Sequence, residues 1–218
     1  VLFKGEQRSC VAAVARVSVL LVALGQEPPS GNTGAYCRAR AKLPVAIIRR
    51  LTRELAARCE RKLPKPWLWH SRHVHLADGF TISMPDTPAN QAEYPQHTVQ
   101  QPGLGFPIAR CVVLLSLATA MASDLAIGPY SGKETGETAL LRELLPRFQA
   151  GDILLADQYY CSYFMICLLL AAGVDFVTRL HHLRKSDFRR GQRLAAGDHV
   201  VQWFRPAKPT WMDQATYE

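Results

Sequence analysis

The stretch from Gly151 to Ser162, GDILLADQYYCS, constrains the fold more than any other part of the chain. Its apolar run, Ile153–Ala156, is short, follows a turn-like glycine and ends at Asp157. A run bounded in this way is typical of a buried central strand rather than a helix. A carboxylate at the end of a buried strand is costly to desolvate, so Asp157 needs a cation, a hydrogen-bond donor or a metal as its partner. Asp157 is therefore either a metal ligand or a residue that ends the strand and caps the helix starting near Cys161.

Length and charge narrow the class of protein. The 218 residues, of which 48% are hydrophobic, suffice for one large domain, or for one domain with a small appendage. A net charge of +8 indicates an acidic partner, with nucleic acid first and a membrane surface second. The six cysteines form no C-x-x-C pair, which favours a reducing compartment. The apolar stretch Val11–Leu24 contains Arg16 and is too short to span a bilayer comfortably, so we expect a cytoplasmic protein with no membrane partner.

The first third of the chain reads as three helices with a basic surface. Val11–Leu24 is expected to be a mostly buried helix, Thr33–Arg40 a second one, and the third begins at Pro44 and continues to about Leu63. The third helix has one apolar face and one basic face. Such a basic face can lie along a phosphate backbone, or it can be an ordinary solvated surface. The DNA-binding candidates are Arg49, Arg50 and Arg53, together with Lys185, Arg189 and Arg190 from a later basic stretch.

In the middle of the chain, apolar and polar residues alternate with a period of two, which predicts strands. One strand runs from Val74 to Met84 and contains Asp78. Two further strands should complete an antiparallel meander with it. The polar segment between the first two strands is expected to be a long exposed loop. The predicted loop is Pro85–Pro102, the two strands are Ile108–Thr119 and Leu125–Pro129, and a tight turn is expected at Ser123–Asp124.

The remaining elements alternate between helix and strand. Leucines at helical spacing predict a helix over Thr138–Phe148, with Glu137 favourably placed in its first turn. After the central strand, a helix is expected over Tyr163–Ala172 and a strand over Asp175–Leu180. Apolar and polar residues alternate again over His199–Phe204, before a proline-rich tail.

This order of three strands, helix, strand, helix and strand is that of a ribonuclease H-like α/β fold with a mixed sheet flanked by helices. In that arrangement the first and fourth strands are neighbours, so Asp78 and Asp157 would face each other. Two carboxylates at such a distance repel unless a divalent cation lies between them, and hard oxygen ligands suit Mg²⁺ or Mn²⁺. Two-metal sites of this kind catalyse in-line phosphoryl displacement.

Four separated blocks, HLADGFTISMPDTPANQAEYPQ, QPGLGFPIAR, DLAIGPYSGKETGE and GDILLADQYYCSYF, resemble the DDE transposases of bacterial insertion sequences, specifically the IS-four group. The resemblance runs from about Ser9 to Tyr217. It implies that Asp78 and Asp157 are the first and second catalytic, metal-ligating residues. It also implies metal-dependent hydrolysis and strand transfer at the ends of a mobile element, with DNA as partner, a homodimer in the synaptic complex and a bacterial, nucleoid-associated location.

The chain departs from the family pattern at two positions beside these carboxylates. Gln158 stands where the family usually has Arg, and Phe80 where it usually has a small hydroxyl residue. The third catalytic Glu of the family lies beyond an inserted β-rich segment, and Glu218 lacks the surrounding signature, so we expect this carboxylate to be absent from the chain and the fragment to be inactive. The expected domains are a helical basic region (1–63), a linker (64–72), an incomplete ribonuclease H-like core (73–181) and the truncated start of the insertion (182–218).

Other interpretations of the same residues are open. The chain could be a non-catalytic, DNA-binding remnant of a transposase, or a ribonuclease H-like nuclease that uses two Asp residues. His70, His73 and His75 could bind zinc with Cys59, although their spacing matches no common zinc pattern, and linker and strand-surface positions explain them. Ser162 is expected to cap a helix, since no nucleophile elbow surrounds it.

Overall fold

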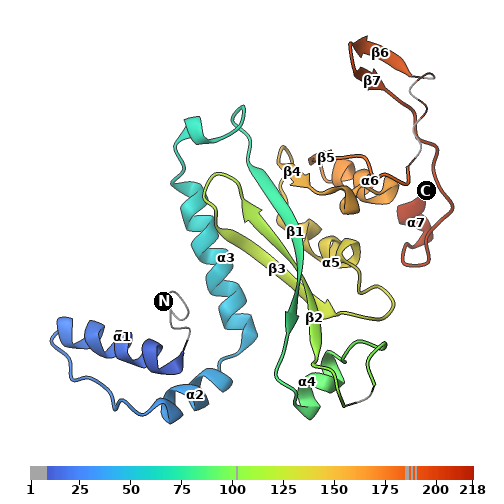
Figure 1. Cartoon of the computed structure of the whole chain (residues 1–218). Helices are drawn as coiled ribbons and strands as arrows, with labels where there is room; N and C mark the ends of the chain where they lie inside the picture. The colour runs from blue at the N-terminus through green and yellow to red at the C-terminus, as the bar shows by residue number, and fades with distance from the viewer. Residues whose placement is uncertain (1–8, 102, 185–186, 188, 190) are drawn as a thin grey trace. The chain divides into compact units, whose positions relative to one another are not determined.

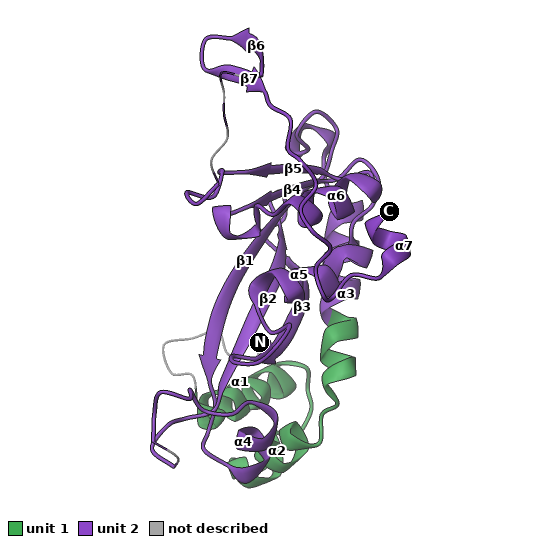
Figure 2. Ribbon diagram, turned by 90° about the vertical axis from the view of Figure 1, so that its right-hand side faces the viewer, with its two compact units in different colours: residues 1–51 green, residues 52–218 purple. Residues whose placement is uncertain are grey.

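The computed structural model describes residues 9–101, 103–184, 187, 189 and 191–218 (Figure 1). The chain divides into two compact units, residues 1–51 and 52–218 (Figure 2). The boundary falls inside helix α3 (Val45–Arg61).

The first unit contains helices α1 (Cys10–Ala23), α2 (Thr33–Ala41) and the start of α3. Ser9 caps α1, since its hydroxyl accepts a hydrogen bond of 3.2 Å from the Ala12 amide. The prediction of a mostly buried first helix is wrong, because only Ala13 and Val14 are buried in α1 while most of its larger apolar side chains are exposed. The main partner of α1 is α2, which is too short and polar to cover an apolar helix.

The second unit is built on a five-stranded mixed sheet in the order β3-β2-β1-β4-β5. Strand β1 pairs antiparallel with β2 and parallel with β4, so the first and fourth strands are neighbours, as the sequence predicted. With helices against the sheet, the arrangement is consistent with a ribonuclease H-like fold (Figure 1). The strands are β1 (Val74–Ser83), β2 (Ile108–Ser116), β3 (Ala122–Pro129), β4 (Ile153–Ala156) and β5 (Asp175–Thr178).

The connections of the meander differ from the prediction in two places. The expected loop after β1 contains the short helix α4 (Pro88–Glu93), which starts with proline at its first position and is capped by Thr87. The turn between β2 and β3 lies at residues 117–121, so Ser123 and Asp124 are inside β3. Asp124 is buried there, because arginines from two other elements compensate its charge.

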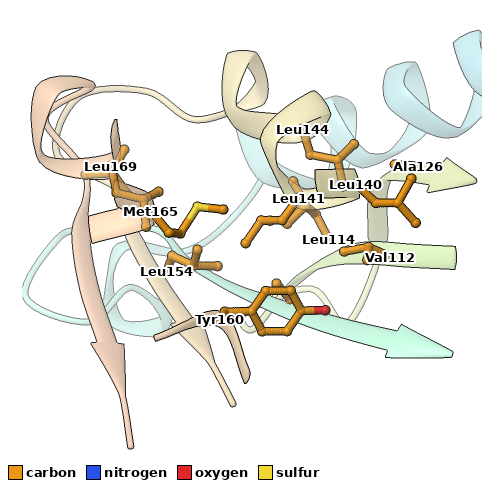
Figure 3. Packing of buried hydrophobic residues seen from close by; sticks show 12 residues of the cluster. Val112, Leu114, Ala126, Leu140, Leu141, Leu144, Leu154, Tyr160, Met165 and Leu169 are labelled. Carbon is orange, nitrogen blue, oxygen red and sulfur yellow. The ribbon is translucent and has the colours of Figure 1, made fainter. Parts of the chain in front are cut away.

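One face of the sheet carries the core. Helix α5 (Glu137–Leu144) packs on β2 and β3, and helix α6 (Tyr163–Ala171) packs against β5. A single turn of 3₁₀ helix, η2 (Leu145–Arg147), follows α5. Tyr160 is almost fully buried among the aliphatic side chains of this core (Figure 3). Other members of the core are Ala77, Val112, Leu114, Ala126, Leu140, Leu141, Leu154, Met165 and Leu169.

The C-terminal part contains a small hairpin and a terminal helix. Strands β6 (Gln192–Ala195) and β7 (Asp198–Val200) pair antiparallel, and the sequence indicated only the second of them. Helix α7 (Gln214–Tyr217) ends the chain, and the Arg142 guanidinium lies 3.8 Å from the centre of the Trp211 ring. The linker carries η1 (Lys65–Trp67), and η3 (Gln158–Tyr160) follows β4. Among the described helices, none has the length and apolar character needed to cross a bilayer.

Candidate metal centre

Asp78 and Asp157 occupy neighbouring positions on adjacent parallel strands. The register pairs Ala77 of β1 with Ala156 of β4, and each Asp is the next residue of its chain. Neighbouring strands lie about 4.8 Å apart, and paired residues of parallel strands project to the same side. The two carboxylates therefore project from the same side of the sheet, opposite to the buried Ala77.

The Asp157 side chain is exposed. The expectation that it would be a buried carboxylate, and would need a partner for that reason, is therefore wrong. Leu154 is fully buried, but Leu155 is 37% exposed, so only part of β4 lies in the core. The Asp157 carboxylate accepts a hydrogen bond of 2.5 Å from the Tyr159 amide and caps η3. The Thr178 hydroxyl donates to the Asp157 carbonyl at 2.9 Å and fixes the backbone. The predicted capping role is thus observed, at η3 rather than at the helix near Cys161.

Asp78 is also exposed, in the middle of β1. Its Oδ1 accepts a hydrogen bond of 2.9 Å from the Gly79 amide. Within the described part of the chain, no ion pair is formed by Asp78 or Asp157, and each keeps an oxygen without a hydrogen bond. Two adjacent carboxylates without a cationic partner are a donor set that fits Mg²⁺ or Mn²⁺.

The Glu137 carboxylate lies against β1 at Gly79, the residue that follows Asp78. Glu137 occupies the first turn of α5, and its carboxylate group is closer than 3.0 Å to the place where a β-carbon on Gly79 would be. Sequence patterns indicated for Glu137 only a favourable place in the first turn of a helix. The available signal was Gly79 itself, since glycine inside a strand often marks a close approach of another group.

The Tyr160 side chain ends beside this group of carboxylates. It is 1% exposed, and its hydroxyl lies against the Glu137 carboxylate. Burial raises the pKa of the Tyr160 hydroxyl above its ordinary range, and the nearby charges of Glu137, Asp78 and Asp157 raise it further. The hydroxyl is therefore neutral and faces the acidic groups. Among the described residues, however, no three His, Cys, Asp or Glu side chains are already close enough together to hold a metal ion.

The predicted DNA-binding arginines differ in their surroundings. Arg53 forms an ion pair with buried Asp124, with 2.8 Å between Nη2 and Oδ2, and Arg147 bonds the same oxygen through Nε at 2.8 Å. Arg53 thus has a structural role that the sequence did not indicate. Arg189 pairs with Asp187 at 2.9 Å and is exposed. Arg49 is half-buried and Arg50 exposed on α3, whereas Lys185 and Arg190 lie outside the described residues.

Two of the three histidines considered as zinc ligands contact carboxylates instead. His73 Nδ1 lies 2.6 Å from Glu60 Oε2, and His75 Nε2 lies 3.2 Å from Asp152 Oδ2. Burial acts to raise the pKa of Asp152, but the bonds from His75 and the Gln149 amide outweigh it and lower this pKa below its ordinary value. The contacts join α3 to β1 and β1 to the start of β4.

Ser162, which follows the central strand and η3, has the expected local role. The Ser162 hydroxyl accepts a hydrogen bond of 3.2 Å from the Met165 amide, and Ser162 is the N-cap of α6. Capping therefore explains this serine, as predicted.

Comparison with known proteins gives one informative match. The scan against family models found no match. The chain is 24% identical over 187 residues to transposase InsG for insertion sequence element IS4 of Escherichia coli strain K12. The match covers 85% of this chain and 41% of that transposase, so the chain spans less than half the length of its relative. The chain is therefore similar over most of its length to an IS4 transposase, in agreement with the resemblance that the four sequence blocks indicated.

Proposed function

We propose that this chain provides the first two carboxylates of a divalent-metal centre for DNA transposition, Asp78 and Asp157. The single observation that carries the proposal is their neighbouring placement on β1 and β4, with Ala77 and Ala156 paired immediately before them. The similarity to an IS4 transposase supports DNA as the substrate. It also favours a DNA-processing enzyme over a non-catalytic remnant.

A bound Mg²⁺ or Mn²⁺ would supply an activated water or hydroxyl nucleophile and charge stabilisation at the leaving oxygen. The chain itself holds and orients the ligands. Asp78 lies within a strand paired on both sides, and the Thr178 hydroxyl fixes the Asp157 backbone, so neither carboxylate depends on a long loop. Gln158, beside Asp157, offers a neutral amide donor to a phosphate oxygen in place of a charged, bidentate guanidinium.

The test separates the metal-binding role of Asp157 from its capping role. Asp157→Asn retains an acceptor for the Tyr159 amide, because Asn is a good cap, but removes the negative charge. We expect Asp78→Asn and Asp157→Asn to fold with unchanged melting temperatures and to lose Mn²⁺ binding, measured by the electron paramagnetic resonance signal of free Mn²⁺. Asp198→Asn, in exposed β7, is the matched control and should bind Mn²⁺ like the unmodified chain. Unchanged Mn²⁺ binding in both site variants would remove the assignment.

The catalytic part of the proposal needs a second experiment. With its natural downstream sequence attached, the chain is expected to cleave the ends of its element in the presence of Mg²⁺, and Asp157→Ala should abolish the cleavage. The chain alone is expected to bind DNA with little or no strand cleavage. Cleavage that persists in the Asp157→Ala protein would contradict the proposed role of this residue.

A further inference from the structure

We propose that the linker before β1, residues 64–72, binds single-stranded DNA by stacking unpaired bases on Trp67 and Trp69. The inference rests on the proposed function, because it takes DNA as the substrate. It adds a contact for the bases, which the two carboxylates do not provide. Neither tryptophan contributes to the core, since Trp67 is 64% exposed and Trp69 is 58% exposed.

The first observation is the spacing of the two indole rings in the connection between α3 and β1 (Figure 1). Trp67 is the last residue of η1, and Leu68 follows it with extended backbone, at φ −87° and ψ 138°. Leu68 is half-buried whereas both tryptophans are exposed, so the two rings flank it on the solvent side. Two residues of extended chain span at most about 7 Å. Stacked bases lie about 3.4 Å apart, so the two rings are close enough to contact one base or two neighbouring bases.

The second observation is the strained turn that carries Trp69. His70 and Ser71 both have positive φ, 49° and 63°, although neither is glycine. The Arg72 amide closes the turn by donating to the Trp69 carbonyl at 3.0 Å. The His70 ring contacts the Trp69 ring edge-on, with 4.5 Å between the ring centres, and still leaves the indole exposed. A turn with this strain persists only where its surroundings enforce it.

The Arg72 side chain supplies that enforcement. Its Nε donates to the Gly151 carbonyl at 2.6 Å and its Nη2 to the Asp152 carbonyl at 3.1 Å. Its Nη1 lies 2.6 Å from Asp175 Oδ2. The turn is thus fixed to the residues at the start of β4 and β5. An aromatic ring that is already held in place loses little conformational freedom when a ligand binds, which favours affinity.

The charge around the tryptophans complements a phosphate backbone. Residues 61–73 contain no Asp or Glu, and Arg61, Lys62 and Lys65 are exposed. Cations beside exposed aromatic rings are the combination by which proteins bind single strands, since the cations contact phosphates while the rings stack on bases. In a duplex the neighbouring base pairs cover the base faces. The linker is therefore expected to prefer single strands.

A membrane surface also attracts tryptophan beside lysine and arginine. Binding of that kind usually needs an amphipathic helix with a long apolar face. The linker offers only the single turn of 3₁₀ helix in η1, Lys65–Trp67. Together with the similarity to an IS4 transposase, this favours DNA as the partner.

The test uses the complete 218-residue chain and a fluorescein-labelled single-stranded oligothymidylate, with binding measured by fluorescence anisotropy. Trp69→Leu keeps an apolar side chain but removes the aromatic face, whereas Trp69→Phe keeps a ring. The matched control is Phe106→Leu, an aromatic residue outside the linker that is 61% exposed. We expect Trp69→Leu to bind at least about fivefold more weakly. Trp69→Phe should recover most of that loss, and Phe106→Leu should bind like the unmodified chain.

The salt dependence separates the stacking contact from the phosphate contacts. Lys65→Gln should lower the slope of log affinity against log salt by about 0.7, the value for one phosphate contact of a single strand. Trp69→Leu should lower the affinity and leave the slope unchanged, because it removes no phosphate contact. A change of slope in Trp69→Leu as large as that in Lys65→Gln would contradict the stacking role.

The outcomes distinguish this inference from the function on which it rests. If Trp67→Leu and Trp69→Leu both bind the oligonucleotide normally, the stacking site is wrong, while Mn²⁺ binding by Asp78→Asn and Asp157→Asn tests the metal centre separately. If the unmodified chain binds neither single-stranded nor duplex DNA, the stacking site and the choice of DNA as substrate both fail.

Three further results would overturn the inference. One is an equal loss in Phe106→Leu, and another is an equal loss of duplex binding in Trp69→Leu. The third is a loss in Trp69→Leu of binding to vesicles of anionic phospholipid without a loss of oligonucleotide binding, which would indicate a membrane contact. Melting temperatures check that each variant folds, and Trp67→Leu replaces Trp69→Leu if the strained turn does not tolerate the change.

Discussion

Arg53 and Asp124 form a buried contact that ties α3 to β3, with Nε and Nη2 of the arginine 2.9 and 2.8 Å from one carboxylate oxygen. Because the Asp124 side chain is 1% exposed, its charge depends on Arg53 and Arg147 for compensation. We expect Arg53→Ala to lower the free energy of unfolding by about 1–3 kcal/mol. The loss should be smaller than for a buried carboxylate left without any cation, because Arg147 still contacts Asp124. Urea unfolding measures the loss.

The matched control for this contact is Arg58→Ala, an exposed arginine of the same helix, which should change stability by less than about 0.5 kcal/mol. The double variant Arg53→Ala/Arg147→Ala should cost more than the sum of the two single changes, because it leaves the buried carboxylate without a cation. Simple additivity would contradict the shared role of the two arginines.

The close approach of Glu137 to Gly79 predicts a coupled pair of substitutions. Gly79→Ala forces the Glu137 carboxylate to move, and we expect a loss of about 1 kcal/mol, since the displaced group is the end of a flexible side chain. Adding Glu137→Ala should recover most of that loss, as a thermal-unfolding double-mutant cycle would show. Gly136→Ala, where a β-carbon meets nothing within 4 Å, is the control. Equal destabilisation by Gly79→Ala in both backgrounds would refute the steric argument.

The lowered pKa of Asp152 predicts a pH-dependent contribution to stability. A carboxylate whose pKa is lower in the folded state stabilises the fold above its unfolded pKa, about 3.9, and this stabilisation is lost as the pH falls through the folded pKa. We expect Asp152→Asn to cost about 1–2 kcal/mol at pH 6 and progressively less below about pH 4. Urea unfolding of both proteins between pH 3 and pH 6 measures the difference; a gap that is constant over about this whole range would contradict the prediction.

The basic face of α3 predicts salt-sensitive DNA binding. If Arg49 contacts a phosphate, Arg49→Ala should lower the slope of log affinity against log salt by about one, in a fluorescence-anisotropy titration with duplex DNA. The control is Arg16→Ala, which removes the same charge from an exposed position of α1. Affinity that does not change between low and high salt would contradict a phosphate-binding surface altogether.

The sheet and the placement of Asp78 and Asp157 were predictable because local patterns specify them. Alternation in β1 and the short apolar run of β4 identify strands, and the order of elements gives their pairing. The turn after β2 was misplaced because Asp124 looks like a turn residue, and its burial depends on Arg53, far away in the sequence. The proximity of Glu137 to Gly79 likewise arises only when α5 packs on the sheet.

The pairing of β1 with β4 also determines when the proposed site comes into existence during synthesis. The meander β1-β2-β3 uses contacts between successive strands, which form early, whereas β4 pairs with β1 across all the intervening elements. A nascent chain that ends before residue 153 can complete the meander and carries Asp78 without Asp157. The proposed two-carboxylate centre can therefore form only after β4 has paired with β1, and a shorter nascent chain carries one carboxylate of the pair.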